Sequence, residues 1–87
     1  MLEFKTISRI ARVLMDMNQT QLSVALGLDI GTVSAWERGI SMPTERHRKA
    51  FEALCVKRNV GFAKNGMPVL MDSDWLRMIE QSGERVA

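Results

Sequence analysis

The lysines and arginines are the side chains whose placement most clearly indicates a chemistry. Residues 1–64 hold ten of them against six acidic residues, a net charge of +4, whereas residues 65–87 hold two against four, a net charge of −2. A polyanion would bind at the basic end of such a chain. Because ordinary solvated surfaces often carry an excess of this size, charge alone favours a nucleic-acid partner only slightly.

The side chains that usually perform catalysis or hold metals are scarce. Cys55 is the only cysteine and His47 the only histidine, so neither a disulfide nor a thiolate metal cluster can form within one chain. The sequence also contains no glycine-rich phosphate loop and no nucleophile with a recognisable base. We therefore predict that the protein is not an enzyme and needs neither a metal nor a cofactor.

The length and composition predict one globular domain. In 87 residues, of which 46% are apolar and 25% charged, two separate cores would each be too small to offset chain entropy. The first ten residues lack the long apolar run of a signal peptide, and no segment is apolar enough to span a bilayer. Since the lone cysteine also suits a reducing compartment, we expect a cytoplasmic protein without membrane contact.

The first of four expected helices covers residues 6–16. Apolar residues recur there at intervals of three or four, which places their side chains on one face of a helix. The expected inward-facing residues are Phe4, Ile7, Ala11 and Leu14. The basic residues Lys5, Arg9 and Arg12 lie off this stripe, so the helix is amphipathic.

The second and third expected helices flank a tight turn. Asn18 can cap the second helix and Gly27 can end it, because glycine accepts the left-handed conformation at a helix end. Asp29 then offers a carboxylate to the free N–H groups that begin the third helix, which ends at Gly39. The expected buried side of the second helix is Leu22, Ala25 and Leu26, and the residues expected to lock the angle between the two helices are Leu22, Ala25, Leu28, Val33 and Trp36.

A fourth helix and a hairpin follow. Pro43 and Thr44 mark the start of the helix, which reaches to about Lys57. Its expected inner face consists of His47, Phe51, Leu54 and Cys55. Beyond it the apolar period changes to two, and Asn65-Gly66 predicts a two-residue type I′ turn. The residues expected on one face of the hairpin are Val60, Phe62, Val69 and Met71, and the pairs expected beside the turn are Lys64 with Met67 and Ala63 with Pro68.

A last short helix is expected near the C-terminus. Asp72 or Ser73 can cap it, and its apolar anchors are Trp75, Leu76 and Ile79. The expected organisation is therefore a helical core over residues 1–58, a β-hairpin over residues 59–71, and a helix with a polar tail over residues 72–87.

One stretch of the chain combines several features at fixed spacing. It reads QTQLSVALGLDIGTVSAWERG over residues 19–39 and is followed by Pro43. With its Gln start, central Gly, TVS segment and WERG end, the sequence closely resembles the Cro/CI-type family of phage repressors and bacterial regulators over about residues 7–55. The resemblance implies a mainly α, lambda-repressor-like helix-turn-helix domain of about four core helices, with a C-terminal β-hairpin and a last short helix. In this fold a steep turn at Gly27 places the third helix in the major groove of DNA.

The resemblance also implies which residues contact DNA bases. The positions from which family members touch base edges are Asp29, Ile30, Gly31, Thr32, Ser34 and Ala35. The chain departs from the family here, because Ile30, Gly31 and Ala35 lack the hydrogen-bonding side chains that many relatives carry. Direct base reading is therefore expected to be sparse. A helix cap is the alternative role for Asp29, and filling an exposed face is the alternative for Ile30 and Ala35.

Other residues are implied to hold the DNA backbone or the fold. The implied phosphate contacts are Gln19, Arg38, Arg46 and Lys49, with Arg48 beside them. Gln19 stands at the positive end of the second helix, where phosphate binds well, while a solvated face is the alternative for the residues on the fourth helix. Arg12 and Glu37 are implied to form a partly buried structural ion pair.

Family members bind as two-fold dimers, so the resemblance implies a homodimer on a near-palindromic double-stranded DNA operator. The residues expected at the dimer interface are Val60, Phe62, Trp75 and Ile79. A monomer whose hairpin caps the core is the alternative. The implied function is a sequence-specific transcriptional regulator of the bacterial nucleoid, acting as a repressor. An antitoxin that binds a toxin and uses the motif for autoregulation is the alternative from another class.

Overall fold

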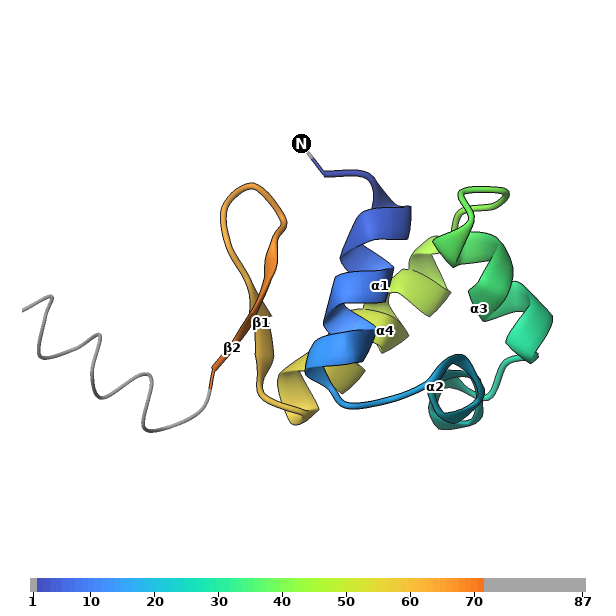
Figure 1. Ribbon diagram of the computed structural model, residues 1–87, viewed down its shortest axis with the longest axis horizontal. Helices are drawn as coiled ribbons and strands as arrows, with labels where there is room; N and C mark the ends of the chain where they lie inside the picture. The colour runs from blue at the N-terminus through green and yellow to red at the C-terminus, as the bar shows by residue number, and fades with distance from the viewer. Residues whose placement is uncertain (1, 72–87) are drawn as a thin grey trace, which may run out of the picture.

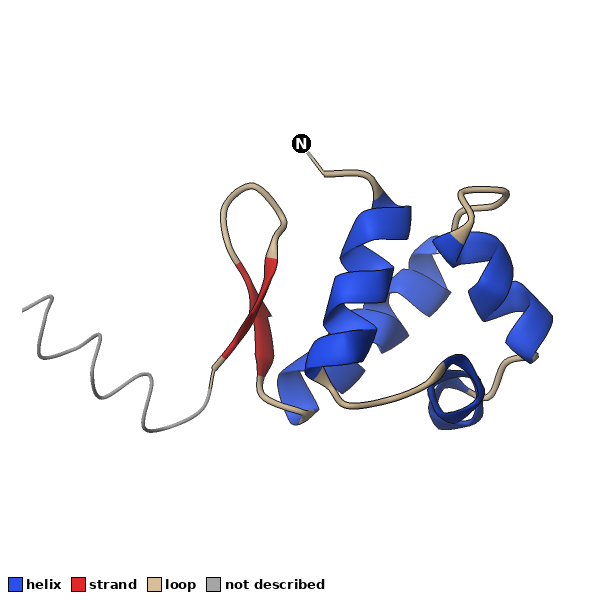
Figure 2. Ribbon diagram, viewed as in Figure 1, coloured by secondary structure: helices blue, strands red, loops and turns tan. Residues whose placement is uncertain are grey.

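A computed structural model describes residues 2–71 of the chain. Its elements are α1 (Phe4–Leu14), α2 (Gln19–Leu26), α3 (Ile30–Glu37), α4 (Glu45–Lys57), β1 (Val60–Phe62) and β2 (Pro68–Leu70). The hairpin lies beside α1 and α4, at the end of the molecule away from α2 and α3 (Figures 1 and 2). The predicted mainly α fold with a small antiparallel hairpin is confirmed, whereas the predicted last helix lies outside the described residues. None of the described helices is long and apolar enough to cross a membrane.

The core forms where the four helices meet β1. Its buried side chains are Phe4, Ala11, Met15, Leu22, Val33, Trp36, Phe51, Cys55 and Val60. The ring of Phe4 meets those of Trp36 and Phe51 edge-on, with centroid distances of 5.7 and 5.5 Å, as the ring quadrupoles favour. Burial, reinforced by the charge of Glu52, raises the pKa of Cys55 to about 12. This thiol therefore stays protonated and packs as a small apolar group.

The first helix begins and ends two residues earlier than the predicted span of residues 6–16. Phe4 is buried, so the packing of its ring extends the helix toward the N-terminus. The helix is closed by Asp16, which has a left-handed φ of 57°, and by a hydrogen bond from the Met17 N–H to the Arg12 carbonyl at 3.1 Å. Glycine usually holds this position and aspartate only tolerates it, so the sequence carried no visible stop signal.

The buried side of α2 differs from the predicted one at one position. Leu22 and Ser23 are buried, whereas Ala25, predicted on the inner face, is exposed. Ser23 can enter the core because its Oγ donates to the Thr20 carbonyl at 2.7 Å, which satisfies the hydroxyl without water. The prediction was wrong because it ranked these residues by apolarity alone.

The hairpin is shifted by one residue from the predicted register. Val60 pairs with Leu70 and Phe62 with Pro68, so residues 64–66 form a three-residue loop in place of the predicted type I′ turn. A shift of one residue turns each side chain to the opposite face of a strand. Val69 and Met71 therefore lie on the opposite face of the hairpin from Val60 and Phe62. The residues that share a face with Val60 and Phe62 are Pro68 and Leu70.

Gly66 is the residue that selects the longer loop. It has a φ of 92°, and its N–H donates to the Ala63 carbonyl at 2.9 Å, while the Ala63 N–H donates to the Met67 carbonyl at 2.9 Å. The Asn65 Oδ1 accepts from the Met67 N–H at 3.0 Å. A glycine with positive φ at the end of a three-residue loop is the second common way to close a hairpin. Ala63 therefore faces Met67, and not Pro68 as predicted.

Candidate nucleic-acid interface

The turn between α2 and α3 is built from one glycine and two backbone hydrogen bonds. Gly27 has a φ of 69°, in the left-handed region. Its N–H donates to the Val24 carbonyl at 3.1 Å, and the Leu28 N–H donates to the Ser23 carbonyl at 2.8 Å, which pairs carbonyls that the helix end leaves free. Beyond the turn the two helices pack on each other (Figure 1). The turn therefore holds α3 at a steep angle to α2.

One side of α3 is buried and the other is open. Val33, Trp36 and Glu37 are buried against the core. The helix ends where Gly39 takes a φ of 74° and the Ile40 N–H donates to the Ala35 carbonyl at 2.9 Å. The outer side of the helix, exposed or half-buried, consists of Ile30, Gly31, Ser34, Ala35 and Arg38. Four of the predicted base-contact residues therefore lie together on this outer side.

The outer side of α3 is narrow and poor in hydrogen-bonding groups. Ile30 is 49% exposed, and a Cβ at Gly31 would meet no atom within 4 Å. Packing within the described chain thus gives no reason for a glycine at that position. Ser34 supplies a hydroxyl, the one side-chain hydrogen-bonding group among the four predicted base-contact residues that lie there. This chemistry suits apolar contact and close approach more than bidentate recognition.

Asp29 and Thr32 lie at the edges of this outer side. The Asp29 backbone occupies the N-cap position of α3, but its carboxylate makes no capping hydrogen bond. The predicted capping contact is therefore wrong, and the exposed carboxylate stays at the edge of the outer side. Thr32 is half-buried, as Ser34 and Ala35 are, and lies one turn before the buried Trp36, which places it at the border between the buried and outer sides.

A bidentate ion pair joins α1 to the end of α3. The Arg12 Nε donates to the Glu37 Oε2 at 2.6 Å, and the Arg12 Nη2 donates to the Glu37 Oε1 at 3.0 Å. The side chains of Arg12 and Glu37 are only 16% and 1% exposed. A third donor of the same guanidinium, Nη1, bonds the Met17 carbonyl at 2.9 Å. The structure thus brings together the two residues expected to pair, in the fork geometry that makes such bonds strong.

Two further side chains reach the same carboxylate. The Gln19 Nε2 donates to the Glu37 Oε1 at 3.2 Å, and the Arg9 Nε lies 3.7 Å from that oxygen. Gln19 is the first residue of α2, directly after the Asn18 cap. Its amide nitrogen keeps a second hydrogen for another acceptor. Glu37 therefore ties α1, α2 and α3 to one another.

The charges around Glu37 determine its ionisation. Burial by itself raises the pKa of a carboxyl group, but the hydrogen bonds from Arg12 and Gln19 and the charges of Arg12 and Arg9 outweigh it and lower the pKa of Glu37. The hydrogen bond to Glu37 also raises the pKa of Arg12, against the opposing effect of burial. Both groups are therefore charged at neutral pH, and the pair persists.

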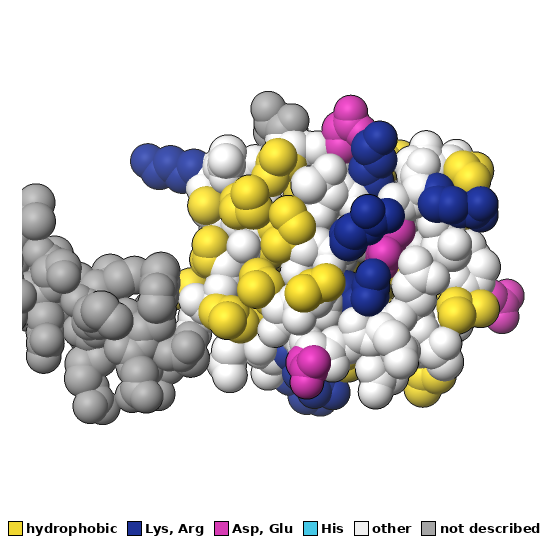
Figure 3. Space-filling view, in the orientation of Figure 1, with side chains coloured by type: hydrophobic (Ala, Val, Ile, Leu, Met, Phe, Trp, Pro, Cys, Tyr) yellow, Lys and Arg dark blue, Asp and Glu magenta, His cyan; other side chains and the backbone are white. Residues whose placement is uncertain are grey.

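A basic recess lies between α1 and the end of α3. Lys5, Arg9 and Arg38 border it, with Glu37 at its inner side. Figure 3 shows lysine and arginine side chains gathered over the junction of these helices. The sequence prediction placed only Arg38 in such a position. The spacing of Lys5, Arg9 and Arg12, four and three residues apart on one helix, was the signal for the others.

The predicted phosphate contacts on α4 do not join this recess. The Lys49 Nζ lies 3.5 Å from Glu45 and the Arg48 Nε lies 3.3 Å from Glu52, each pair one turn apart on the helix. These four residues line a hollow that includes no residue of α2 or α3. Arg46 is exposed in the first turn of α4. Among the basic residues expected on the DNA side, Arg38 is therefore the one that the structure places at the end of α3.

The four residues expected at a dimer interface fall into three situations. Val60 is 0% exposed, so its side chain belongs to the core and the prediction that it contacts a second subunit is wrong. Phe62 is 37% exposed and is available to a partner. Trp75 and Ile79 lie outside the described residues.

Comparison with known proteins gives one family match, and it covers the helix-turn-helix elements. A family model for helix-turn-helix domains matches residues 6–47, which runs from α1 into the first turn of α4. Comparison with curated proteins found no significant match, and neither did comparison with solved structures.

Proposed function

Residues 6–47 belong to the Cro/CI-type helix-turn-helix family of DNA-binding regulators, and on that premise we propose that this protein binds double-stranded DNA sequence-specifically and represses transcription. The proposal is carried by one observation: α3 has its inner side fixed to the core and its outer side free of other described elements. A helix held in this way can enter the major groove of B-DNA.

Sequence reading is proposed to depend on shape and methyl groups more than on bidentate hydrogen bonds. Ile30 and Ala35 would pack on thymine methyl groups, and the Ser34 hydroxyl would bond a base edge or a phosphate. Gly31 lets the helix axis approach the bases more closely than any other residue would. Asp29 would accept from a cytosine amino group at the rim of the contact.

The backbone contacts are proposed to flank the groove on both sides. Gln19 would present its second amide hydrogen and the N-terminus of α2 to one phosphate. Arg38, with Arg9 and Lys5 beside it, would neutralise phosphates at the other end of α3. Because Arg9 already bridges to Glu37, its guanidinium is held near the position where it would act.

We further propose that two copies bind a near-palindromic operator, with half-sites about one helical turn or roughly 34 Å apart. One domain of this size contacts few base pairs, and the outer side of its α3 has few hydrogen-bonding groups. A second copy doubles the number of base contacts and so supplies the missing specificity. Occupying a promoter with such a dimer would exclude polymerase and repress the gene.

Selection of bound duplexes from a random pool tests this function. We expect a palindromic sequence with A·T pairs opposite the outer side of α3. The variant Ala35→Glu should abolish binding to the selected duplex, because it places an acid against the groove, while Ala53→Glu on the exposed side of α4 serves as the matched control. Thermal melting of both variants shows whether the fold is intact.

Two results would contradict the proposal. If Ala35→Glu binds as well as the parent, α3 does not enter the groove in this orientation. If no sequence is enriched from the pool, the protein does not read DNA selectively, and the antitoxin alternative takes its place.

A further inference from the structure

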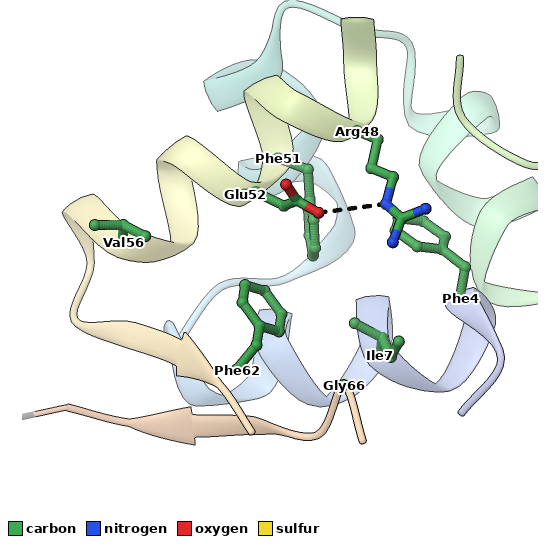
Figure 4. A pocket seen from close by; sticks show the side chains of 8 residues that line it. All are labelled: Phe4, Ile7, Arg48, Phe51, Glu52, Val56, Phe62 and Gly66. Carbon is green, nitrogen blue, oxygen red and sulfur yellow. Dashed lines mark hydrogen bonds and ion pairs between the residues drawn. The ribbon is translucent and has the colours of Figure 1, made fainter. Parts of the chain in front are cut away.

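An apolar groove lies between α1, α4 and the hairpin (Figure 4). It encloses about 340 Å³. The side chains that shape it are Phe4, Ile7, Phe51, Val56 and Phe62, with Gly66 of the hairpin loop at one end. Figure 4 shows the ion pair of Arg48 and Glu52 along its upper edge. None of these residues has a part in the proposed DNA contacts.

The groove leaves large apolar side chains in water. Val56 is 67% exposed and Phe62 is 37% exposed, and they lie on two different elements that face the same space. Contiguous apolar surface rimmed by charged residues is typical of a site that binds another protein segment. The proposed dimer needs such a site outside the helix-turn-helix unit.

We propose that the groove binds residues 72–87 of a second copy of this chain, and that the exchange in both directions forms the dimer. This inference rests on the proposed function, which requires two copies on one operator. Within that segment, Met78 and Ile79 stand three and four positions after Trp75, the spacing of one helix face, and Leu76 stands beside them. A helix with this pattern binds an apolar groove through such anchors.

Charge favours the same occupant. Residues 2–71 carry ten basic against six acidic side chains, whereas residues 72–87 carry two against four. The segment therefore has the opposite net charge from the body it would bind. Opposite charges steer the encounter and penalise other orientations.

The position of the described chain end favours a second copy over the same chain. The Met71 N–H donates to the Asn59 carbonyl at 2.6 Å, which holds the end of β2 at the open end of the hairpin. No residue of β2 lines the groove, and only three residues separate Met71 from Trp75, which is a short connection for docking within one chain. A groove and a segment on each subunit together make a self-complementary two-fold interface.

Sedimentation of full-length variants tests the docking. The parent should have twice the mass of one 9.8 kDa chain. We expect Val56→Glu in the groove and Ile79→Glu in the segment to sediment each as a monomer, with a dissociation constant raised at least tenfold. Val13→Glu is the matched control, because Val13 is 62% exposed and lies outside the groove.

An equal mixture of the two charged variants identifies the occupant. In each mixed pair the intact segment of one chain meets the intact groove of the other, so one of the two contacts returns. A dimer that is weaker than the parent's and absent from either variant alone supports the proposal. A mixture that stays monomeric, with both variants folded by circular dichroism, overturns it. A parent that is monomeric yet selects a DNA sequence also overturns the docking and leaves the proposed function standing. A dimeric parent that selects no sequence overturns the proposed function alone.

Discussion

The helix-turn-helix half of the molecule adds a buried polar network to its apolar packing, whereas the hairpin half is held mainly by apolar packing. In the first half, Glu37 receives hydrogen bonds from α1 and α2 and is 1% exposed at its side chain. In the second half, the hairpin packs through apolar side chains such as Val60, and the neighbouring ion pair of Arg48 and Glu52 is about half exposed. Directional bonds fix an angle between helices, whereas apolar packing chiefly excludes water. The half that is proposed to bind DNA, and that needs a fixed angle between its helices to do so, is the half with the directional bonds.

The largest expected effect comes from breaking the buried pair. Glu37→Gln removes the charge that Arg12 faces and should lower the free energy of unfolding by about 3–5 kcal/mol. Glu45→Gln is the matched control. The side chains of Lys49 and Glu45 are 73% and 83% exposed, and an exposed ion pair of this kind contributes at most about 1 kcal/mol. Urea denaturation of both variants makes the comparison. If both variants lose the same free energy of unfolding, the contacts of Glu37 do not stabilise the helix-turn-helix half more than an exposed ion pair does.

The same pair should make stability depend on acid. The pKa of Glu37 is lowered from its ordinary value of 4.5 in the folded protein, so its contribution is complete above that value and is lost as the pH falls through the lower, folded value. Denaturation measured from pH 7 downward should show stability falling in the parent. The fall should be smaller in Glu37→Gln, and an identical profile in both proteins would remove Glu37 as the cause.

In the hairpin half, one glycine should matter more than its neighbours. Gly66→Ala must hold alanine at a φ of 92° and bring its Cβ to 3.3 Å from the Ile7 Cδ1, so we expect a loss of about 1–2 kcal/mol. Lys64→Ala in the same loop should change stability by less than about 0.5 kcal/mol. Thermal melting distinguishes the two. A harmless Gly66→Ala would mean that the loop has another conformation in solution.

The smallest effect on stability should have the opposite sign. Gly31→Ala adds a Cβ that meets nothing within 4 Å, so it should stabilise α3 by about 0.5–1 kcal/mol. If close approach to DNA is the reason for this glycine, affinity for the selected duplex should fall about tenfold, or about 1.4 kcal/mol. The control Ala53→Gly on α4 should lose stability and keep affinity. A Gly31→Ala variant that keeps full affinity would show that the helix does not sit so deep.

Local signals account for the parts of the fold that the sequence predicted. The cap at Asn18 and the glycines at positions 27 and 39 act on their own helices, and the structure has a helix boundary at each of them. The family spacing that placed Arg12 opposite Glu37 is long-range, but the resemblance supplied it. These features depend on residue type and spacing, which a sequence displays directly.

The misplaced features depend on tertiary contacts or on rare local choices. Asp16 closes α1 in a conformation that glycine usually takes, and Ser23 is buried because a carbonyl of its own helix satisfies it. The hairpin register turned on whether the loop had two or three residues, and Asn65-Gly66 is compatible with both. Arg9 was not assigned a role because its contact with Glu37 joins residues 28 positions apart. A single sequence does not show such contacts.

The buried thiol of Cys55 can report how often the core opens. Only a thiolate reacts readily with an alkylating reagent, and burial holds the pKa of this group at about 12. The sulfur lies in the core that the four helices and β1 share, so a reagent reaches it only when those elements separate. Because it is the chain's only cysteine, the rate of labelling of the unmodified protein reports how often the core opens, without any added probe.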